Sequence, residues 1–350
     1  MYLRGGIVVK THVLKATPEN VIWGHYDNER EPVVKVKSGE AVLVEVVTHH
    51  AGDAPDYMMD DEIKELYEAI PEEDRGPGCH PVTGPIYVEG VEPGDVIECR
   101  VLDMRVRPTT PYGINFQANW GLLYDDLGKE EHVTLYKVDE KTATAEAVFT
   151  YKYPIFLGTK SGIITPPESV ERKPALEGVR VPLRYHIGLA ATAPAEKGKI
   201  NTIPPGVFGG NIDQRNWGVG DSLYLPAQVS GGQMFFGDCH SAEGDGEISG
   251  TAIETNMNIL VQLIVRDDIK TESPLLETKT HWASHGLHPD LDEATRIAAL
   301  EMIKFLETHK GLSKTEAYSL LSVAGDFNIT QVVDQEKGVH CLLRKDIFEK

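Results

Sequence analysis

The chain has 350 residues, of which 41% are hydrophobic, which is enough for the core of one large domain or of two ordinary ones. A formal net charge of -20 and a sequence pI near 5.1 argue against nucleic acid or a membrane surface as a partner, because polyphosphates and anionic lipids would be repelled. A small neutral or cationic substrate suits this charge better.

The amino-terminal stretch lacks an apolar core followed by a small-residue cleavage site, and no apolar run approaches the length of about 18 residues that spans a bilayer. We therefore expect a cytoplasmic protein. The four cysteines are far apart and form no C-x-x-C pair, so we expect free thiols rather than a disulfide framework or a zinc ribbon.

The first half of the chain reads as short strands separated by Gly and Pro. The segments 31–50 and 84–106 both show strand patterns on either side of a turn, at Ser38-Gly39 and at Glu92 to Asp95. These two hairpin-like units predict a β-sandwich or barrel. Between them, residues 60–70 have apolar side chains at helical spacing and predict a helix.

Further strands are predicted within residues 142–153, 178–192, 221–238 and 249–267. The pattern then changes near Pro289. Residues 289–311 predict a long helix, with a capping box from Asp290 to Glu293 and Gly311 just beyond its end. A second capping box, from Ser313 to Glu316, opens a shorter helix, and residues 328–333 are expected to form the last strand.

The predicted fold class is mainly β with an α+β C-terminal part: a β-sandwich body of antiparallel strands with helices packed at the C-terminal end. We expect a β-rich N-terminal half over 1–160 and a β-rich C-terminal half with a helical appendix over 161–350. The two halves are expected to form one intertwined catalytic unit. The segment from about 160 to 180 is the most plausible seam.

Four carboxylates and a histidine crowd the segment GDCHSAEGDGE at 237–247, which is costly unless a cation, hydrogen bonds or water compensate. In a strand Asp238 and His240 point the same way, a spacing that suits two ligands of a zinc-like ion. The alternative is that Asp238 only orients or caps and that the backbone satisfies His240. Further ligands would come from His49 or His50 at a strand end, or from His80.

Asp245 and Glu247 share one side of an extended chain, and either is a candidate general base. The alternative is a solvated hairpin tip. A second Gly-rich loop, at 204–218, carries Asn211 and Asp213 and lacks the Gly-Lys-Ser/Thr of a phosphate loop. The histidine group at 281–288 is a weaker metal candidate, because Gly286 and Pro289 interrupt a helix there.

Several long stretches resemble the acetamidase/formamidase family. The resemblance is carried by PPGVFGGNID at 204–213, by LYLPAQVSGGQMFFGDCHSAEGDGEISGTAIE at 223–254, by HPVTGPIYVEGVEPGD at 80–95 and by the tail from residue 289. It spans nearly the whole chain in the right order. It implies an oligomeric cytosolic enzyme with a β-sandwich body that hydrolyses small aliphatic amides to a carboxylate and ammonia.

The resemblance supports a set of site residues, namely Asp238, His240, Asp245, Gly246, Glu247, Glu254, His80, Asn211 and Asp213. Three features differ from the family pattern. Cys239 takes the place of other small residues and is no nucleophile, Glu243 adds a charge where a neutral residue is expected, and residues 48–70 are longer and more acidic.

The sequence thus predicts an amide hydrolase in which Asp238, His240, Glu254 and His50 hold a divalent ion, zinc before calcium, that activates water. Glu247 or Asp245, with His240, would carry out proton transfer, while Asn211, Asp213 and His80 would bind the amide. In one alternative, the same carboxylates act as general acid and base without a metal ion. A calcium-stabilised β-sandwich binding module is the other.

Overall fold

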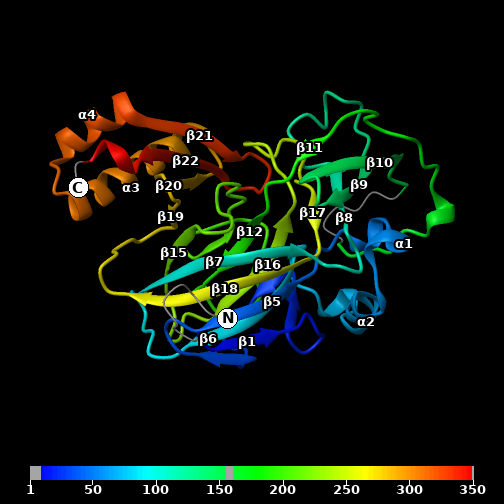
Figure 1. Ribbon diagram of the computed structural model, residues 1–350, viewed down its shortest axis with the longest axis horizontal. Helices are drawn as coiled ribbons and strands as arrows, with labels where there is room; N and C mark the ends of the chain where they lie inside the picture. Colours follow the sequence, from blue (N-terminus) through cyan, green and yellow to red (C-terminus); the bar gives the residue numbers. More distant parts are fainter. Residues whose placement is uncertain (1–8, 155–160, 349–350) are drawn as a thin grey trace.

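The computed structural model describes residues 9–154 and 161–348. Its strands form two large sheets that face each other, with helices at both ends (Figure 1). Almost all strand pairs of the described residues are antiparallel, the exceptions being β1 with β5 and β4 with β6. The predicted mainly β class with C-terminal helices is confirmed.

The nine-stranded sheet has the order β1-β5-β18-β7-β15-β19-β20-β22-β21. Its strands are β1 (Thr11–Leu14), β5 (Ala41–Val46), β7 (Val96–Val106), β15 (Ser222–Pro226), β18 (Met257–Arg266), β19 (Leu275–Glu277), β20 (His281–His288), β21 (Gly325–Gln331) and β22 (Lys337–Arg344). Strands from before residue 160 and after residue 161 alternate at its centre. The boundary expected at residue 160 touches segment 155–160, which lies outside the described residues.

The eleven-stranded sheet has the order β11-β10-β9-β8-β17-β16-β12-β14, and β6 joins it by pairing with β16, β2 and β4. Its strands are β2 (Val21–Trp23), β4 (Val34–Val36), β6 (Pro81–Val88), β8 (Tyr112–Gln117), β9 (His132–Asp139), β10 (Thr144–Lys152), β11 (Val181–Pro182), β12 (His186–Ala191), β14 (Gly209–Asn211), β16 (Met234–His240) and β17 (Glu254–Thr255). A small separate sheet pairs β3 (His25–Tyr26) with β13 (Ile200–Asn201).

The main core lies between the two large sheets. It joins buried side chains of one sheet, such as Val44 and Val101, to buried side chains of the other, such as Ile187 and Phe236. Burial of this apolar surface is the dominant force that holds the sheets together.

The two turns that the sequence predicts as hairpins connect the sheets instead. Ser38-Gly39 joins β4 to β5, and the turn at Glu92 to Asp95 joins β6 to β7, yet each pair of strands belongs to different sheets. The hairpin interpretation is therefore wrong, because an alternating pattern and a turn say nothing about which strand is the partner.

The helices are α1 (Pro55–Met58), α2 (Asp61–Ala69), α3 (Leu291–Lys310) and α4 (Lys314–Ala324), and short 3-10 turns occur at Ala51–Asp53, Glu72–Asp74, Pro167–Ser169 and Lys345–Ile347. Helices α3 and α4 pack on the β20–β22 end of the nine-stranded sheet (Figure 1). No helix within residues 9–154 and 161–348 is both long and apolar enough to cross a bilayer.

The predicted starts of the C-terminal helices are mostly correct. The capping box of Ser313 and Glu316 is present at α4. At α3, Asp290 accepts from the backbone N–H of Glu293, but its own N–H donates to His288 Nδ1, so the reciprocal half of the predicted box is missing. The strand predicted at 328–333 is β21, and one more strand, β22, follows it.

Candidate active site

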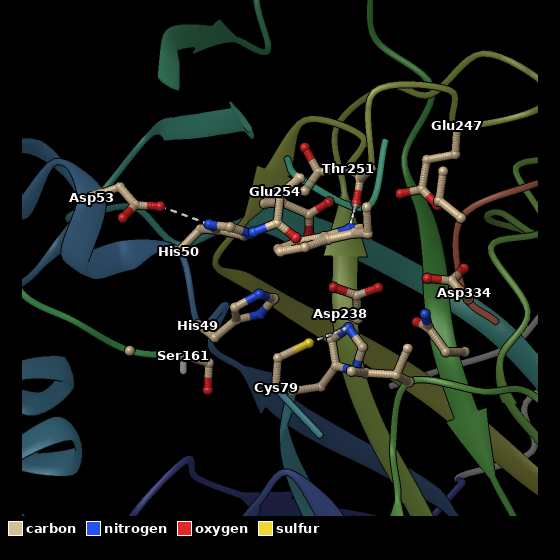
Figure 2. A pocket seen from close by; sticks show the side chains of 18 of the residues that line it. His49, His50, Asp53, Cys79, Ser161, Asp238, Glu247, Thr251, Glu254 and Asp334 are labelled. Carbon is tan, nitrogen blue, oxygen red and sulfur yellow. Dashed lines mark hydrogen bonds and ion pairs between the residues drawn. The ribbon is translucent and has the colours of Figure 1, made fainter. Parts of the chain in front are cut away.

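A cavity of about 360 Å³ lies where β16 and β17 meet the turn after β5 and the segment before β6 (Figure 2). Its ionisable lining comprises His49, His50, Asp53, Cys79, His80, Asp238, Glu247, Glu254 and Asp334. Apolar walls come from Trp120, Ile163, Ile203 and Val333. Sites of about 300 to 1,000 Å³ are typical for small ligands, so this cavity is at the small end of that range.

Three of the predicted site residues have a left-handed backbone, which non-glycine residues rarely adopt. The φ angles are 48° at Asp213, 53° at Asp238 and 48° at Glu247. Such conformations cost about 1–3 kcal/mol each and concentrate at functional sites. The strain is a second, independent sign that this region has a function beyond stability.

His240 lies at the centre of the site and is completely buried. Its Nε2 lies 3.1 Å from Asp238 Oδ2 and 3.3 Å from Glu254 Oε2. Its Nδ1 lies 3.2 Å from Glu243 Oε2 and 3.0 Å from His186 Nε2. The ring therefore connects two carboxylates beside the cavity to a buried carboxylate and histidine behind it.

Glu254 is brought to His240 by strand pairing. Strand β17 is antiparallel to β16 in a register that places Glu254 opposite His240. Backbone N–H of Ala252 donates to Glu254 Oε1, while Oε2 has no hydrogen-bond partner among the described residues. One oxygen of this carboxylate is therefore held by the backbone, while the other faces the His240 ring 3.3 Å away.

The charges of this cluster are strongly coupled. Burial lowers the pKa of His240, but Glu254 and Asp238 outweigh burial and raise it well above its usual value. Burial raises the pKa of Asp238, but His240 and His80 bring it well below its usual value. The two shifts together favour a pair of opposite charges, with Asp238 Oδ2 3.1 Å from His240 Nε2.

Three other carboxyl groups that line the cavity are shifted toward the neutral form. Burial, then repulsion by Asp238, raises the pKa of Glu254 to about 7. Burial, with a contribution from Asp238, raises the pKa of Asp334 to about 8, and burial with Asp334 raises that of Glu247 well above its usual value. A bound cation would reverse these shifts, because it favours the ionised form of nearby carboxylates.

Donor atoms of Asp238, His240 and Glu254 all lie within 4.8 Å of one another, and all three residues are buried. They form three of the four predicted metal ligands. The fourth, His50, lines the same cavity but is not in that group. Its Nδ1 lies 2.6 Å from Asp53 Oδ2, and its Nε2 is buried without a hydrogen-bond partner among the described residues.

The structure also brings the expected substrate-binding residues to this region. Asn211 and His80 line the cavity, and Asn211 Oδ1 is buried without a partner in the described part of the chain. Asp213 lies behind the cavity, in a group with His240 and Glu247 whose donor atoms are within 4.8 Å of one another.

Asp245 is not brought to the cavity. Its Oδ1 lies 2.6 Å from Arg215 Nε, and the pair lies in a separate recess on the other side of the loop at 241–253. Glu247 borders both the recess and the cavity. The two carboxylates that the sequence treats as equivalent therefore have different surroundings.

Two buried residues of the site have no signal in the local sequence. Asp334 reaches the cavity from the turn between β21 and β22, and His186 reaches His240 from β12. Neither stands in an acidic or histidine-rich segment, so only the pairing of distant strands could have revealed them.

The fold and the cavity are those of a β-rich enzyme that acts on a small molecule. A family model described as the Acetamidase/Formamidase family matches residues 12–199 and 195–350. The chain belongs to this family. The prediction of an amidohydrolase of this type is confirmed.

Individual relatives agree with this assignment. A formamidase of Methylophilus methylotrophus is 28% identical over 317 residues, which cover 77% of this chain and 77% of that protein. An acetamidase of Mycolicibacterium smegmatis is 28% identical over 200 residues, which cover 49% of each chain.

Solved structures show the same fold. An acetamidase from Bacillus halodurans has a TM-score of 0.75 and 28% identity, with 96% of this chain and 98% of that chain covered. An acetamidase from Yersinia enterocolitica has a TM-score of 0.77 and 26% identity, with 99% and 95% covered. A γ-lactamase from Delftia acidovorans, at 20% identity and a TM-score of 0.56, shares the fold.

Proposed function

We propose that this protein hydrolyses short aliphatic amides of the formamide and acetamide type to a carboxylate and ammonia, with a divalent ion held by Asp238, His240 and Glu254. The observation that carries the proposal is the buried donor group beside a cavity of about 360 Å³. Family membership supports the reaction class, and the donor group supports the ion.

The donor set favours zinc or a similar transition ion. Two carboxylates and an imidazole are a mixed oxygen and nitrogen set, whereas calcium prefers six to eight oxygen ligands. An ion bound there would lower the pKa of water and polarise the amide carbonyl. Glu254 Oε2, which has no hydrogen-bond partner among the described residues, fits a ligand role.

The chain's own groups would orient the amide. Asn211 Oδ1 faces the cavity region as a buried acceptor without a partner among the described residues, and the N–H₂ of a primary amide would donate to it. The apolar walls at Trp120 and Val333 would receive a short acyl chain. This division of the cavity favours primary amides with few carbons.

Glu247 is the better candidate for proton transfer to the leaving amine. It lines the cavity, whereas Asp245 is paired with Arg215 in the separate recess. Proton transfer by a positioned side chain contributes about 10²–10⁴-fold to rate. His240, enclosed by its carboxylate partners, would bind the ion together with Asp238 and Glu254 rather than contact the amide.

The two alternatives have less support. A metal-free mechanism would leave Glu254, Glu247 and Asp334 buried close together, with pKa values raised by burial and mutual repulsion. A calcium-stabilised binding module would use oxygen-only coordination, but His240 lies inside the donor group. A homo-oligomeric, cytoplasmic enzyme remains a prediction from the family resemblance.

The test measures metal content and ammonia release from formamide, acetamide and a longer amide, before and after chelation. We expect zinc to co-purify, and we expect chelation to abolish turnover until zinc is restored. His240→Ala should lose the ion held by the Asp238, His240 and Glu254 group, and turnover with it. Full activity in a preparation free of transition ions would contradict the need for a metal ion. It would leave the assignment as an amidase unchanged.

A matched pair of variants assigns the proton-transfer group. Glu247→Gln should lower turnover by at least 10²-fold, whereas Asp245→Asn, two residues away in the same loop but paired with Arg215, should keep most of it. If Asp245→Asn lowers turnover more than Glu247→Gln does, Asp245 is the proton-transfer group instead.

A further inference from the structure

A second group of side chains of the kinds that bind metals lines another part of the same cavity. Donor atoms of His49, Cys79 and His80 all lie within 4.8 Å of one another. His49 and His80 are buried, and Cys79 is half-buried. This group shares no residue with the Asp238, His240 and Glu254 group.

The ring of His80 is already oriented as a ligand. Its Nδ1 lies 3.2 Å from Thr202 Oγ1, and the same hydroxyl accepts from the His80 backbone N–H. With Nδ1–H donating to Thr202, the lone pair of Nε2 points toward Cys79 Sγ, 3.3 Å away. Histidines that bind metals almost always donate their other ring N–H to a protein oxygen in this way.

His49 supplies an independent sign of a missing ligand. Its side chain is more than nine-tenths buried, and its Nδ1 has no hydrogen-bond partner among the described residues. Its ring packs edge to face against His80, with ring centroids 5.2 Å apart. A buried polar atom without a partner is costly unless water or an ion completes its coordination.

We propose that His49, Cys79 and His80 bind a second, thiophilic cation, with zinc as the expected ion. The set of one sulfur and two nitrogens is softer than the mixed oxygen and nitrogen set around His240, and soft donors select zinc over magnesium or calcium. Three protein ligands leave the fourth tetrahedral position open toward the cavity. The cavity thus has two cation sites of different chemistry.

Binding at this site has a defined proton balance. A cysteine binds a metal as the thiolate, whereas a free cysteine side chain is mainly a thiol at neutral pH. Binding of the cation forms a metal–sulfur bond, breaks the S–H bond and releases one proton to solvent. A histidine binds a metal through a neutral ring, so a ring that is neutral beforehand releases no proton.

The experiment replaces the metal with cobalt(II) in the full chain and records the near-ultraviolet thiolate-to-cobalt charge-transfer band. The wild-type protein should show the band, and Cys79→Ser should lose it together with about one equivalent of bound metal. Cys239→Ser is the matched control, because Cys239 is buried in the core between the sheets and should leave the band unchanged.

Two further variants separate this site from the one in the proposed function. His240→Ala should keep the charge-transfer band while it loses the other equivalent of metal. Thr202→Val should retain the fold and weaken cobalt binding at this site by about 10–100-fold. Absence of the band from the wild-type protein at saturating cobalt, or its survival in Cys79→Ser, would overturn the second site without affecting the first.

Discussion

Gly188 lies directly against the ring of His240. A Cβ added at Gly188 would stand 2.6 Å from His240 Cε1 and 2.5 Å from Asp213 Oδ1. Gly188 belongs to β12, the strand that pairs with β16. The absence of a side chain at this position is therefore what allows His240 and Asp213 to approach each other.

We predict that Gly188→Ala displaces His240 and lowers turnover at least tenfold. The stability cost should be about 1–3 kcal/mol, typical of an overpacked core. Ammonia release and chemical denaturation measure the two effects. Gly244→Ala is the control, since a Cβ there meets nothing within 4 Å. Equal activity in both variants would show that the contact does not constrain the site.

Glu243 positions the far side of the His240 ring. Its Oε2 lies 3.2 Å from His240 Nδ1 and 2.7 Å from His186 Nε2. We predict that Glu243→Ala weakens zinc binding by about 10–100-fold, the usual effect of losing a group that orients a metal-binding histidine. Glu243→Gln, which keeps an acceptor oxygen, should recover most of the affinity. Equilibrium dialysis measures the zinc affinity of both variants. If Glu243→Ala binds zinc as tightly as the wild type, an orienting role for Glu243 is refuted.

His285 is predicted to make stability depend on pH. Burial lowers its pKa to about 4, although its Nδ1 lies 2.9 Å from Pro274 O. Between pH 6.5 and 4 the unfolded chain binds the proton and the native chain does not, so stability falls as pH falls through this window. The loss from pH 7 to 5 should be about 2 kcal/mol.

Denaturation midpoints of the wild type and His285→Gln at pH 7 and pH 5 test this. The variant is less stable at pH 7, but the His285 share of its pH dependence should disappear. His12, which lies near the surface and pairs with Glu40, gives the control variant His12→Gln. An unchanged pH slope in His285→Gln would assign the effect to other groups.

The capping box of α4 should contribute to stability without affecting catalysis. Ser313 Oγ accepts from the backbone N–H of Glu316, and the Glu316 carboxylate accepts from the Ser313 N–H. Ser313→Ala should cost about 1 kcal/mol. Lys314→Ala, at the exposed first turn, should be nearly neutral. Turnover lower than wild type in Ser313→Ala under native conditions would link α4 to the site.

The sequence predicts local features well and long-range partners poorly. The i, i+2 spacing of Asp238 and His240 places both at the site, and helical periodicity places α3 and α4 correctly. The turn at Ser38-Gly39 does not reveal that β4 and β5 enter different sheets. The helices and the i, i+2 spacing depend on neighbouring residues in the chain. The sheet that a strand joins depends on partners far away in the sequence.

The same distinction explains what was missed at the site. Asp334 stands after an ordinary strand pattern, and Cys79 is one of four widely spaced cysteines. Their importance comes from the cavity, to which Cys79 comes from the segment before β6 and Asp334 from the turn after β21. Asp245 was overvalued for the opposite reason, since the crowded sequence conceals its pairing with Arg215.

The insertion of β18 between β5 and β7 has a consequence for biosynthesis. During translation β5 and β7 leave the ribosome long before β18. The edges of these two strands that pair with β18 therefore stay unpaired until β18 has been made. Folding dominated by such distant pairings is slow and leaves partly folded chains prone to aggregation. Newly made chains that stop before residue 257 should therefore depend on chaperones and be degraded, rather than accumulate as a stable amino-terminal fragment.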